Sequence, residues 1–410
     1  MENILIVGAG QAGLQIAVSL REGGFEGTVT IVGAEQYPPY QRPPLSKAFL
    51  HGDSDIESLE LRAQDFYDEN RIDLVCGDAV AAIEFDGAVG HARTVSGRTI
   101  EFDGLALATG SEPRRLPVEG AELDGVLYLR DIDDALELKE RWDAAADVVV
   151  IGGGFIGLEV AAGATRDGKD VTVLEALDRL IARAVSPEMS EFLRAAHERR
   201  GTTVRLGARI TRLVGDAGRV TGVELDGGEI VPADIVMVGI GVVPRGDLAA
   251  QLGLECVNGA VVVDEFAATS HPGVVAAGDS VLLPNPLGGG ELVRLESVQN
   301  AVDQAKTAAA TLLGERVAYE SVPWFWSDQA DLKLQIAGLS TGYDSTVVRG
   351  DPESEHFSIL YYRHGRLIAI DTVNNVHDYL AGKKALAQGQ TVPPESAADA
   401  SVPLKTLVAD

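Results

Sequence analysis

One short pattern occurs twice in this chain. ILIVGAGQAGLQIA begins at Ile4, and VVVIGGGFIGLEVA begins at Val148. Each places an apolar, β-branched run before G-x-G-x-x-G and a helix-like segment after it, which predicts a strand, a tight turn and a helix N-terminus around a dinucleotide pyrophosphate. The glycines are Gly8, Gly10 and Gly13 in the first copy and Gly152, Gly154 and Gly157 in the second, where we also assign Ile156 to the site.

An acidic residue ends the next predicted strand of each copy. Glu35 closes TVTIVGAE and Glu175 closes DVTVLE. Both lie about 20 residues beyond their glycine loops, where a carboxylate accepts hydrogen bonds from a ribose diol. The alternative for each is an acid that only caps a loop. Two loops with two correctly spaced acids favour two bound dinucleotides.

The repetition extends beyond the motif. After each acid the sequence predicts a three-stranded meander and then a buried strand that ends on glycine. These strands lead into LALATGSEP, which holds Thr109 and Gly110, and into MVGIGVVPR, which holds Gly241. We expect both segments to end beside a dinucleotide, as strand ends at a switch point do. The fold class is therefore α/β with two Rossmann-like modules.

A later segment, TSHPGVVAAGDSV, looks like the flavoprotein strand whose aspartate binds the ribityl chain, and this assigns Asp279 to FAD. Because it follows the second module, we expect residues 1–113 and 244–318 to form a discontinuous FAD domain around an inserted NADH domain, residues 114–243. Residues 319–410 form a third, α+β domain with a predicted hairpin turn at His364-Gly365 and a flexible tail.

Composition restricts the partners. The net charge is −28, from 34 basic and 62 acidic residues, which argues against nucleic acid and anionic membranes. The N-terminus enters the first strand at once, so we expect no signal peptide. The most apolar run, around residues 148–164, carries Glu159 and glycine turns, so we expect no membrane span. Two cysteines far apart in the sequence indicate a reducing compartment, and we expect a cytoplasmic location. Cys76 and Cys256 lie far apart and form no C-x-x-C or C-x4-C pair. They are expected to be packing residues, with a single reactive thiol as the alternative. The seven histidines show no metal-ligand spacing, so no metal is expected.

Eight segments together carry a family resemblance: YQRPPLSK, LALATGSEPR, YLRDIDDA, GGGFIGLE, GIGVVP, AAGDS, RLESVQNA and VPWFWSDQ. The chain resembles the bacterial ferredoxin reductases of cytochrome P450 and ring-dioxygenase systems, of the putidaredoxin reductase and rhodocoxin reductase type, and more distantly apoptosis-inducing factor. The resemblance covers essentially the whole chain and implies a glutathione-reductase-like fold with FAD and NADH. Arg245 stands where asparagine is common in this family.

The resemblance also implies roles for single residues. Arg42 and Lys47 would reach FAD, with Lys47 near the isoalloxazine and paired with Glu159. Arg130 would contact FAD, and Val298 would start a helix that faces flavin O2. For Lys47 and Glu159 the alternative is a pair of solvated helix residues.

Two of the three tryptophans, Trp324 and Trp326, are separated by one residue. On a strand both rings lie on one face, which the family uses beside the flavin. We expect a flavin wall, with Trp326 the stronger candidate, and plain core packing as the alternative.

The predicted activity is FAD-dependent NADH:ferredoxin oxidoreductase. Hydride would pass from nicotinamide C4 to flavin N5, and single electrons would pass to a [2Fe–2S] ferredoxin. The alternatives are an NADH-dependent peroxidase or disulfide reductase, and a redox-sensing interaction protein. Glu175 predicts a preference for NADH over NADPH, and Arg179 and Arg183 lie close enough to soften it. Of these two arginines, we place Arg183 at the NADH site. Lys306 and, more weakly, Lys333 are candidate docking charges for ferredoxin, and ordinary solvated lysines are the alternative.

Overall fold

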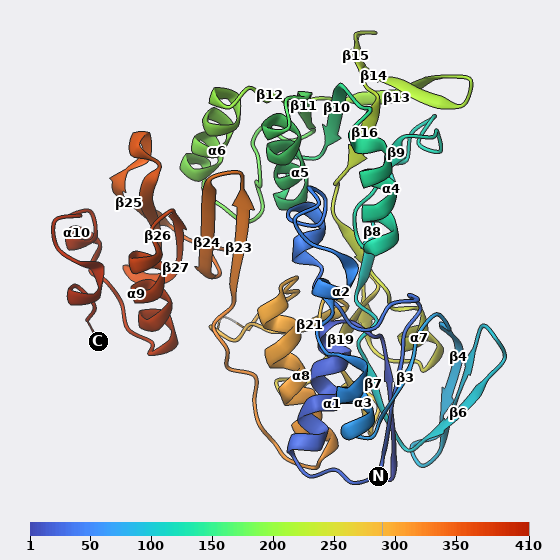
Figure 1. Ribbon diagram of the computed structural model, residues 1–410. Coiled ribbons are helices and arrows are strands. Elements are labelled where there is room, and N and C mark those ends of the chain that lie inside the picture. Colours follow the sequence, from blue (N-terminus) through green and yellow to red (C-terminus); the bar gives the residue numbers. More distant parts are fainter. Residues whose placement is uncertain (289, 410) are drawn as a thin grey trace. The chain divides into compact units, whose positions relative to one another are not determined.

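The computed structural model describes residues 1–288 and 290–409, and its chain forms two compact units (Figure 1). The first unit contains Met1–Gln41, Glu57–Glu112 and Val243–Pro323. The second contains Arg42–Ile56, Pro113–Val242 and the chain from Trp324 onward. Thus the YQRPPLSK segment divides between the units, and its part from Arg42 groups with the second.

A five-stranded parallel sheet forms the centre of the first unit, in the order β20-β7-β1-β2-β3. Its strands are β1 (Asn3–Val7), β2 (Thr28–Val32), β3 (Ile72–Val75), β7 (Gly104–Leu107) and β20 (Val274–Ala276). The strands β1, β2 and β20 are short, β-branched and largely buried, as expected for strands covered on both faces. The helices α1 (Gln11–Glu22) and α8 (Val298–Leu312) pack side by side and share the buried core with this sheet.

Smaller elements complete the first unit. The expected meander is the antiparallel sheet β4 (Val80–Phe85), β5 (Gly90–Thr94) and β6 (Thr99–Phe102). A second small sheet contains β18 (Cys256–Val257), β19 (Ala260–Val262), β21 (Val281–Pro284) and β22 (Leu292–Val293). The short helices are α3 (Gln64–Glu69) and α7 (Asp247–Gln251).

The second unit contains another parallel sheet of five strands, in the order β12-β11-β10-β16-β9. Its strands are β9 (Val126–Leu127), β10 (Asp147–Ile151), β11 (Asp170–Glu175), β12 (Thr203–Leu206) and β16 (Ile235–Val238). Its helices are α4 (Ile132–Trp142), α5 (Phe155–Arg166) and α6 (Pro187–Arg199). The repeated meander is β13 (Ile210–Asp216), β14 (Arg219–Leu225) and β15 (Ile230–Pro232). Two parallel sheets with the same connections confirm the predicted α/β class.

The C-terminal part of the second unit is an antiparallel sheet in the order β23-β24-β27-β26-β25. Its strands are β23 (Trp324–Gln329), β24 (Leu332–Gly338), β25 (Ser345–Asp351), β26 (His356–Arg363) and β27 (Arg366–Val373). The helix α9 (Val376–Ala387) packs against β27 and β24. His364 and Gly365 both have positive φ, +51° and +76°, as a two-residue hairpin turn requires.

The prediction of a flexible tail at the C-terminus is wrong. Val392, Ala397 and Leu404 are buried in the core of the C-terminal sheet. The buried guanidinium of Arg349 donates to the carbonyls of Ala397 at 3.1 Å and Val402 at 2.6 Å, and it pairs with Asp378 at 2.9 Å. A segment rich in proline, alanine and serine is ordered here because an internal arginine satisfies its backbone carbonyls.

Candidate functional site

The first glycine loop leaves space in front of β1. A Cβ on Gly8 would lie 2.1 Å from the carbonyl oxygen of Ala108, and one on Gly13 would lie 1.9 Å from that of Gly8. No atom of the described chain lies within 4 Å of a Cβ on Gly10. The outer glycines therefore allow close backbone packing, and the middle one borders open space at the start of α1, which fits a pyrophosphate.

Glu35 lies just beyond the end of β2, in the same sheet. The hydroxyl of Tyr40 donates a 2.5 Å hydrogen bond to Oε2 of Glu35. The backbone N–H of Gly77, beyond the neighbouring β3, donates to the carbonyl oxygen of Glu35 at 2.7 Å. The Tyr40 bond orients the carboxylate of the half-buried Glu35 and the Gly77 bond fixes its backbone, at the carboxyl edge of the sheet, where a ribose is expected.

Thr109 and Gly110 follow β7 at this same edge. Thr109 Oγ1 donates to the carbonyl oxygen of Arg245 at 2.7 Å, and the N–H of Arg245 donates to the carbonyl of Gly110 at 3.0 Å. The side chain of Arg245 is 43% exposed, and its Nε lies 3.5 Å from Glu112 Oε2. The departure from asparagine therefore leaves the loop intact, because backbone atoms make these contacts.

Asp279 lies beyond the end of β20, again at the carboxyl edge. Ser111 Oγ donates to its Oδ2 at 3.3 Å. The neighbouring N–H of Gly278 donates to Oε1 of the buried Gln304 in α8 at 2.8 Å. This bond fixes Asp279 relative to α8, whose first residue is Val298 and whose N-cap, Ser297, accepts from the N–H of Asn300 at 3.1 Å.

The second glycine loop, between β10 and α5, repeats the geometry of the first. A Cβ on Gly152 would lie 2.4 Å from the carbonyl oxygen of Gly239, and one on Gly157 would lie 2.3 Å from that of Gly152. The nearest described atom to a Cβ on Gly154 is 3.9 Å away. Ile156, in the first turn of α5, is 42% exposed beside this space. The second module thus also has room for a pyrophosphate.

Glu175, the last residue of β11, is bound directly to the second glycine loop. Its Oε2 accepts from the N–H of Gly153 at 2.7 Å, and its Oε1 accepts from the N–H of Leu177 at 2.7 Å. The exposed Arg183 extends toward Gly241, where a Cβ would lie 3.5 Å from its Nη2. Glu175 and Arg183 therefore lie beside the two segments, the second glycine loop and the chain at Gly241, that the sequence assigned to one dinucleotide.

Lys47 and Glu159 form an ion pair inside the second unit, with Nζ 2.6 Å from Oε2. The Glu159 side chain is only 5% exposed and accepts two further bonds: from Ser46 Oγ at 2.6 Å and from Ser327 Oγ at 2.7 Å. Three donors offset the cost of burying the carboxylate. Sequence reasoning missed Ser46 and Ser327; their positions beside Lys47 and Trp326 were the only available signals.

Arg42 and Arg130 also lie together in the second unit, where Nη1 of Arg42 donates to the carbonyl oxygen of Arg130 at 2.6 Å. The N–H of Arg130 donates to Asp134 Oδ2 at 2.8 Å, within the capping box of α4. The helix cap therefore fixes the backbone that Arg42 contacts.

Trp324 and Trp326 share one face of β23, with ring centroids 5.7 Å apart and planes at 32°. Nζ of Lys383 lies 4.1 Å from the centre of the Trp324 ring, and Trp324 packs against the C-terminal core. Trp324 thus has a packing role in addition to any contact with a cofactor, whereas Trp326 lies outside that core cluster.

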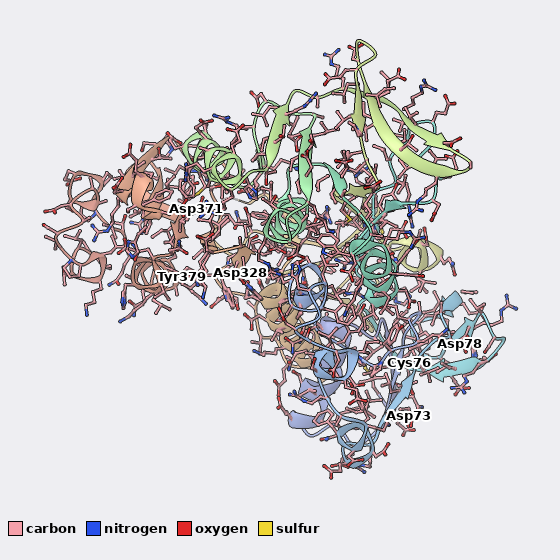
Figure 2. The ribbon with its side chains drawn as sticks, turned by 45° about the horizontal axis from the view of Figure 1, so that its top comes forward. Asp73, Cys76, Asp78, Asp328, Asp371 and Tyr379 are labelled. Atoms are coloured by element: carbon pink, nitrogen blue, oxygen red, sulfur yellow. The ribbon has the colours of Figure 1, made fainter. Side chains whose placement is uncertain are left out.

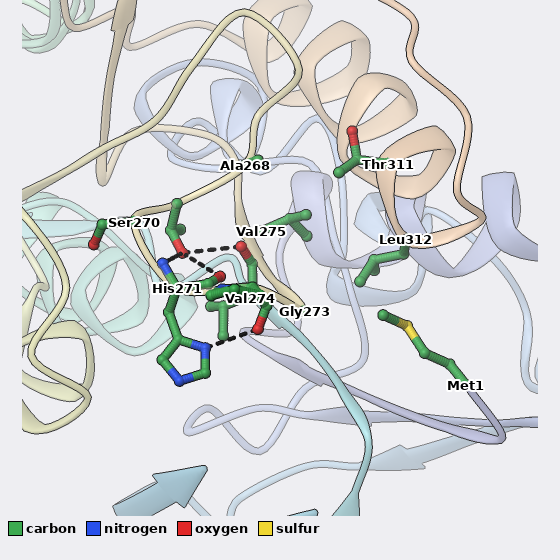
Figure 3. A pocket seen from close by; sticks show the side chains of 11 residues that line it. Met1, Ala268, Ser270, His271, Gly273, Val274, Val275, Thr311 and Leu312 are labelled. Carbon is green, nitrogen blue, oxygen red and sulfur yellow. Dashed lines mark hydrogen bonds between the residues drawn. The ribbon is translucent and has the colours of Figure 1, made fainter. Parts of the chain in front are cut away.

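A cavity of about 200 Å³ lies at the opposite end of the first sheet (Figure 3). Met1 and Gly273, which border it, come just before β1 and β20. In open α/β sheets ligands bind at the carboxyl ends of the strands, so this cavity is no part of the nucleotide site. Within residues 1–288 and 290–409 no cluster of side chains fits a metal ion. Among the same residues, no helix is both long and apolar enough to cross a bilayer.

Comparison with known proteins agrees with this geometry. The family model described as pyridine nucleotide-disulphide oxidoreductase matches residues 2–305, and the one described as reductase C-terminal matches residues 324–408. Rhodocoxin reductase of Rhodococcus erythropolis is 48% identical over 99% of this chain and 94% of its own length. Putidaredoxin reductase of Pseudomonas putida is 39% identical over 100% of this chain and 97% of its own.

Two solved structures match almost the whole chain. The ferredoxin reductase of the CYP199A2 system from Rhodopseudomonas palustris is 43% identical, with a TM-score of 0.95 and full coverage of both chains. The reductase in the covalent putidaredoxin reductase–putidaredoxin complex is 39% identical, also with a TM-score of 0.95, covering 99% of this chain and 98% of that one. The resemblance inferred from sequence motifs is confirmed. The chain belongs to the pyridine nucleotide-disulphide oxidoreductase family, among the ferredoxin reductases of the rhodocoxin and putidaredoxin reductase type.

Proposed function

We propose that this protein is a flavoprotein reductase that takes hydride from NADH onto FAD and passes single electrons to a [2Fe–2S] ferredoxin serving a cytochrome P450 or another oxygenase. The observation that carries the proposal is the presence of two glycine loops, each bordering open space and each followed by an oriented carboxylate. The family supplies the cofactor classes, FAD and a nicotinamide dinucleotide. When bound, the flavin supplies the chemistry that converts a two-electron donor into single electrons.

In this proposal the first module holds FAD. The N-terminus of α1 would bind the pyrophosphate, Glu35 a ribose diol and Asp279 a ribityl hydroxyl. The other proposed FAD contacts are Gly8, Gly10, Gly13, Arg42, Lys47, Thr109, Gly110, Arg130, Val298, Trp324 and Trp326.

The second module would hold NADH through Gly152, Gly154, Ile156, Gly157 and Gly241. Glu175 would accept from the ribose diol, and its charge would repel a 2′-phosphate. The guanidinium of Arg179 is committed to its own loop, donating to the carbonyls of Val185 at 2.7 Å and Ala182 at 2.5 Å. Of the two arginines, Arg183 is therefore the one whose charge would reduce the preference for NADH over NADPH.

Lys47 and Glu159 are the proposed residues at the hydride-transfer face. Ser46 and Ser327 donate to the Glu159 carboxylate and fix it, and this carboxylate in turn accepts from the ammonium of Lys47. A cation held in this way would favour negative charge on the reduced flavin, if Lys47 lies beside the bound ring as proposed. The contribution of Lys47 therefore depends on Ser46 and Ser327 as well as on Glu159.

The peroxidase or disulfide-reductase alternative requires a redox cysteine. Burial raises the thiol pKa of both Cys76 and Cys256, and the charges of Glu35 and Glu255, respectively, raise it further. Both cysteines are free. A thiol that resists ionisation is a poor nucleophile, so neither residue favours this alternative.

Ferredoxin docking is proposed at Lys306, with Lys333 as the weaker candidate. Lys306 is 55% exposed, but its Nζ lies 3.0 Å from Asp303 Oδ1. Lys333 is exposed on β24, directly opposite Asp328 of β23. Because each lysine has an acidic neighbour, any attraction for an acidic ferredoxin would be local and sensitive to salt.

The test uses the purified holoenzyme under anaerobic conditions. NADH is expected to bleach the flavin absorbance, and a [2Fe–2S] ferredoxin is expected to reoxidise it with two ferredoxins reduced per NADH. Bleaching followed by slow reoxidation with ferricyanide and with every ferredoxin tried would favour the redox-sensing alternative. Absence of bleaching by NADH would refute the reductase assignment.

A further inference from the structure

The loop that follows Glu175 is held in an unfavourable backbone conformation. We call residues 176–186, between β11 and α6, the ribose loop. Within it, Ile181 has φ +49°, in the left-handed region that a β-branched residue rarely adopts. Its N–H donates to the carbonyl of Gly153 at 3.0 Å, while the N–H of Gly153 donates to Glu175. Such a conformation persists only where neighbouring contacts fix it, and here they join the loop to the glycine turn.

The far end of the ribose loop is fixed by the C-terminal sheet. The N–H of Ser186 donates to the hydroxyl oxygen of Tyr361 at 2.9 Å, and this hydroxyl donates to Oδ2 of Asp371. Ser340 Oγ donates to the carbonyl of Ala184 at 3.1 Å. Tyr361 and Asp371 have no exposed surface. The contact is therefore internal to the fold, with no competition from water.

Strand register explains why these two residues meet. Tyr361 of β26 lies opposite Ala369 of β27, and Asp371 is two residues further along the same strand. Diagonal neighbours of this kind point to the same face of an antiparallel sheet and are within reach of a long side chain. The sheet thus presents a tyrosine whose hydroxyl is oriented by a carboxyl group toward Ser186 (Asp371 is labelled in Figure 2).

The helix that follows the loop is held by the same sheet along its length. The rings of Phe192 and Phe357 lie 4.7 Å apart, and His197 Nε2 lies 2.8 Å from Gln329 Oε1. Near the helix end, Arg200 Nε donates to Asp331 at 2.8 Å. Figure 1 shows α6 beside β24. The C-terminal sheet therefore fixes both α6 and the loop that leads into it.

We propose that the C-terminal sheet sets the affinity for the nicotinamide dinucleotide, because Tyr361, oriented by Asp371, holds the ribose loop in the conformation that places Glu175 and Arg183 at the adenine-side ribose. Tyr361 is a positioning residue and touches no substrate itself. The inference rests on the proposed function in placing the dinucleotide at Glu175. It gives the C-terminal domain a role in binding the electron donor.

The test compares two neighbouring tyrosines. The hydroxyl of Tyr362, also fully buried, has no hydrogen-bond partner within the described residues, so Tyr362→Phe removes the same atom without releasing the loop. With NADH and ferricyanide as substrates of the holoenzyme, Tyr361→Phe should raise the KM for NADH about fivefold, the effect of one lost hydrogen bond. The kcat and the KM for ferricyanide should be unchanged, since only binding of the dinucleotide is weakened. Tyr362→Phe should match the wild type.

A second variant tests the inference independently, in case Tyr361→Phe does not fold. Ser340→Ala removes the half-buried hydroxyl that donates to the carbonyl of Ala184 in the ribose loop, and it should raise the KM for NADH about twofold. If the KM for NADH in Tyr361→Phe and Ser340→Ala equals that of Tyr362→Phe, the inference is wrong. It is equally wrong if kcat or the KM for ferricyanide changes by the same factor. A wild-type enzyme that fails to oxidise NADH would instead refute the proposed function.

Discussion

Ser327 Oγ donates a 2.7 Å hydrogen bond to Oε1 of Glu159, whose other oxygen accepts from Lys47. The serine thereby fixes the carboxylate that fixes the lysine. Ser327→Ala should therefore slow reduction of the flavin by saturating NADH about fivefold, with little change in the KM for NADH. Anaerobic stopped-flow absorbance measures this rate directly.

The control is Ser54→Ala, in the same unit. Ser54 Oγ is buried and has no partner within residues 1–288 and 290–409, so its removal breaks no bond of the Glu159 cluster. Equal rates of flavin reduction in the two variants would argue against a role for Ser327 in positioning Glu159.

Nucleotide preference follows from Glu175. The wild type should use NADH with a kcat/KM more than about tenfold above that for NADPH, because a carboxylate beside a 2′-phosphate costs binding energy. Glu175→Gln keeps the shape and removes the charge, so it should narrow the ratio of the two kcat/KM values about tenfold. Asp178→Asn makes the same change in charge at an exposed position of the ribose loop and should leave the ratio unchanged. Comparable kcat/KM values for NADH and NADPH in the wild type would contradict the assignment.

The repeated pattern explains how much of this fold could be predicted. Glycines at fixed spacing, buried β-branched runs and acids about 20 residues on are local signals, and they indicated both modules. The bonds of Ser327 to Glu159 and of Tyr361 to Ser186 join residues that are distant in the chain. No periodicity in the sequence reports such pairs. They had to be found in the structure.

The run HFSILYYR shows why side-chain roles within a strand are hard to predict. All but its terminal residues are buried, so alternation does not distinguish Tyr361 from Tyr362. Only the register between β26 and β27 shows that Tyr361 meets Asp371. The prediction of a flexible C-terminal tail was wrong for a related reason. The composition of the tail predicts coil, but Arg349, about 50 residues earlier in the chain, orders it.

FAD retention should depend on Asp279. Asp279→Ala removes the carboxylate that Ser111 orients and that we assign to a ribityl hydroxyl. Loss of this acceptor should raise the dissociation constant of FAD at least about tenfold, measured by flavin release during dialysis and by reconstitution. Asp73→Ala, an exposed acid on β3 of the same unit (Figure 2), is the control. Full flavin content and unchanged thermal stability in Asp279→Ala would count against the assignment.

Ferredoxin docking should respond to a local charge. Lys306→Glu should raise the KM for ferredoxin several-fold at low salt and flatten its salt dependence, because rim charges act on encounter. Reduction of ferricyanide should be unaltered. Arg93→Glu, exposed on β5, makes the same change in net charge elsewhere on the first unit. If both variants raise the KM equally, overall charge is responsible and Lys306 is no docking residue.

The free energy of unfolding should fall with rising pH, because the buried carboxyl group of Asp371 must ionise. Complete burial raises the pKa of this carboxyl to about 7, and the hydrogen bond from Tyr361 offsets only part of the shift. In the unfolded chain the pKa is about 3.9, so between roughly pH 4 and pH 7 the native state binds more protons than the unfolded state. The contribution of Asp371 is therefore fully present below about pH 4 and is lost as the pH rises through about 7.

Asp371→Asn keeps a neutral acceptor for Tyr361 and cannot ionise. Relative to this variant, the wild type should lose unfolding free energy steadily from about pH 4 to pH 7 and no further above it. Denaturant titrations of both proteins across this range give the difference. Asp371 accepts from the hydroxyl of Tyr361, and this hydroxyl accepts from the N–H of Ser186. Ionisation of Asp371 therefore puts a full negative charge next to the tyrosine that holds the ribose loop. A constant difference in unfolding free energy between the two proteins at all pH values would show that Asp371 does not change its protonation in this range.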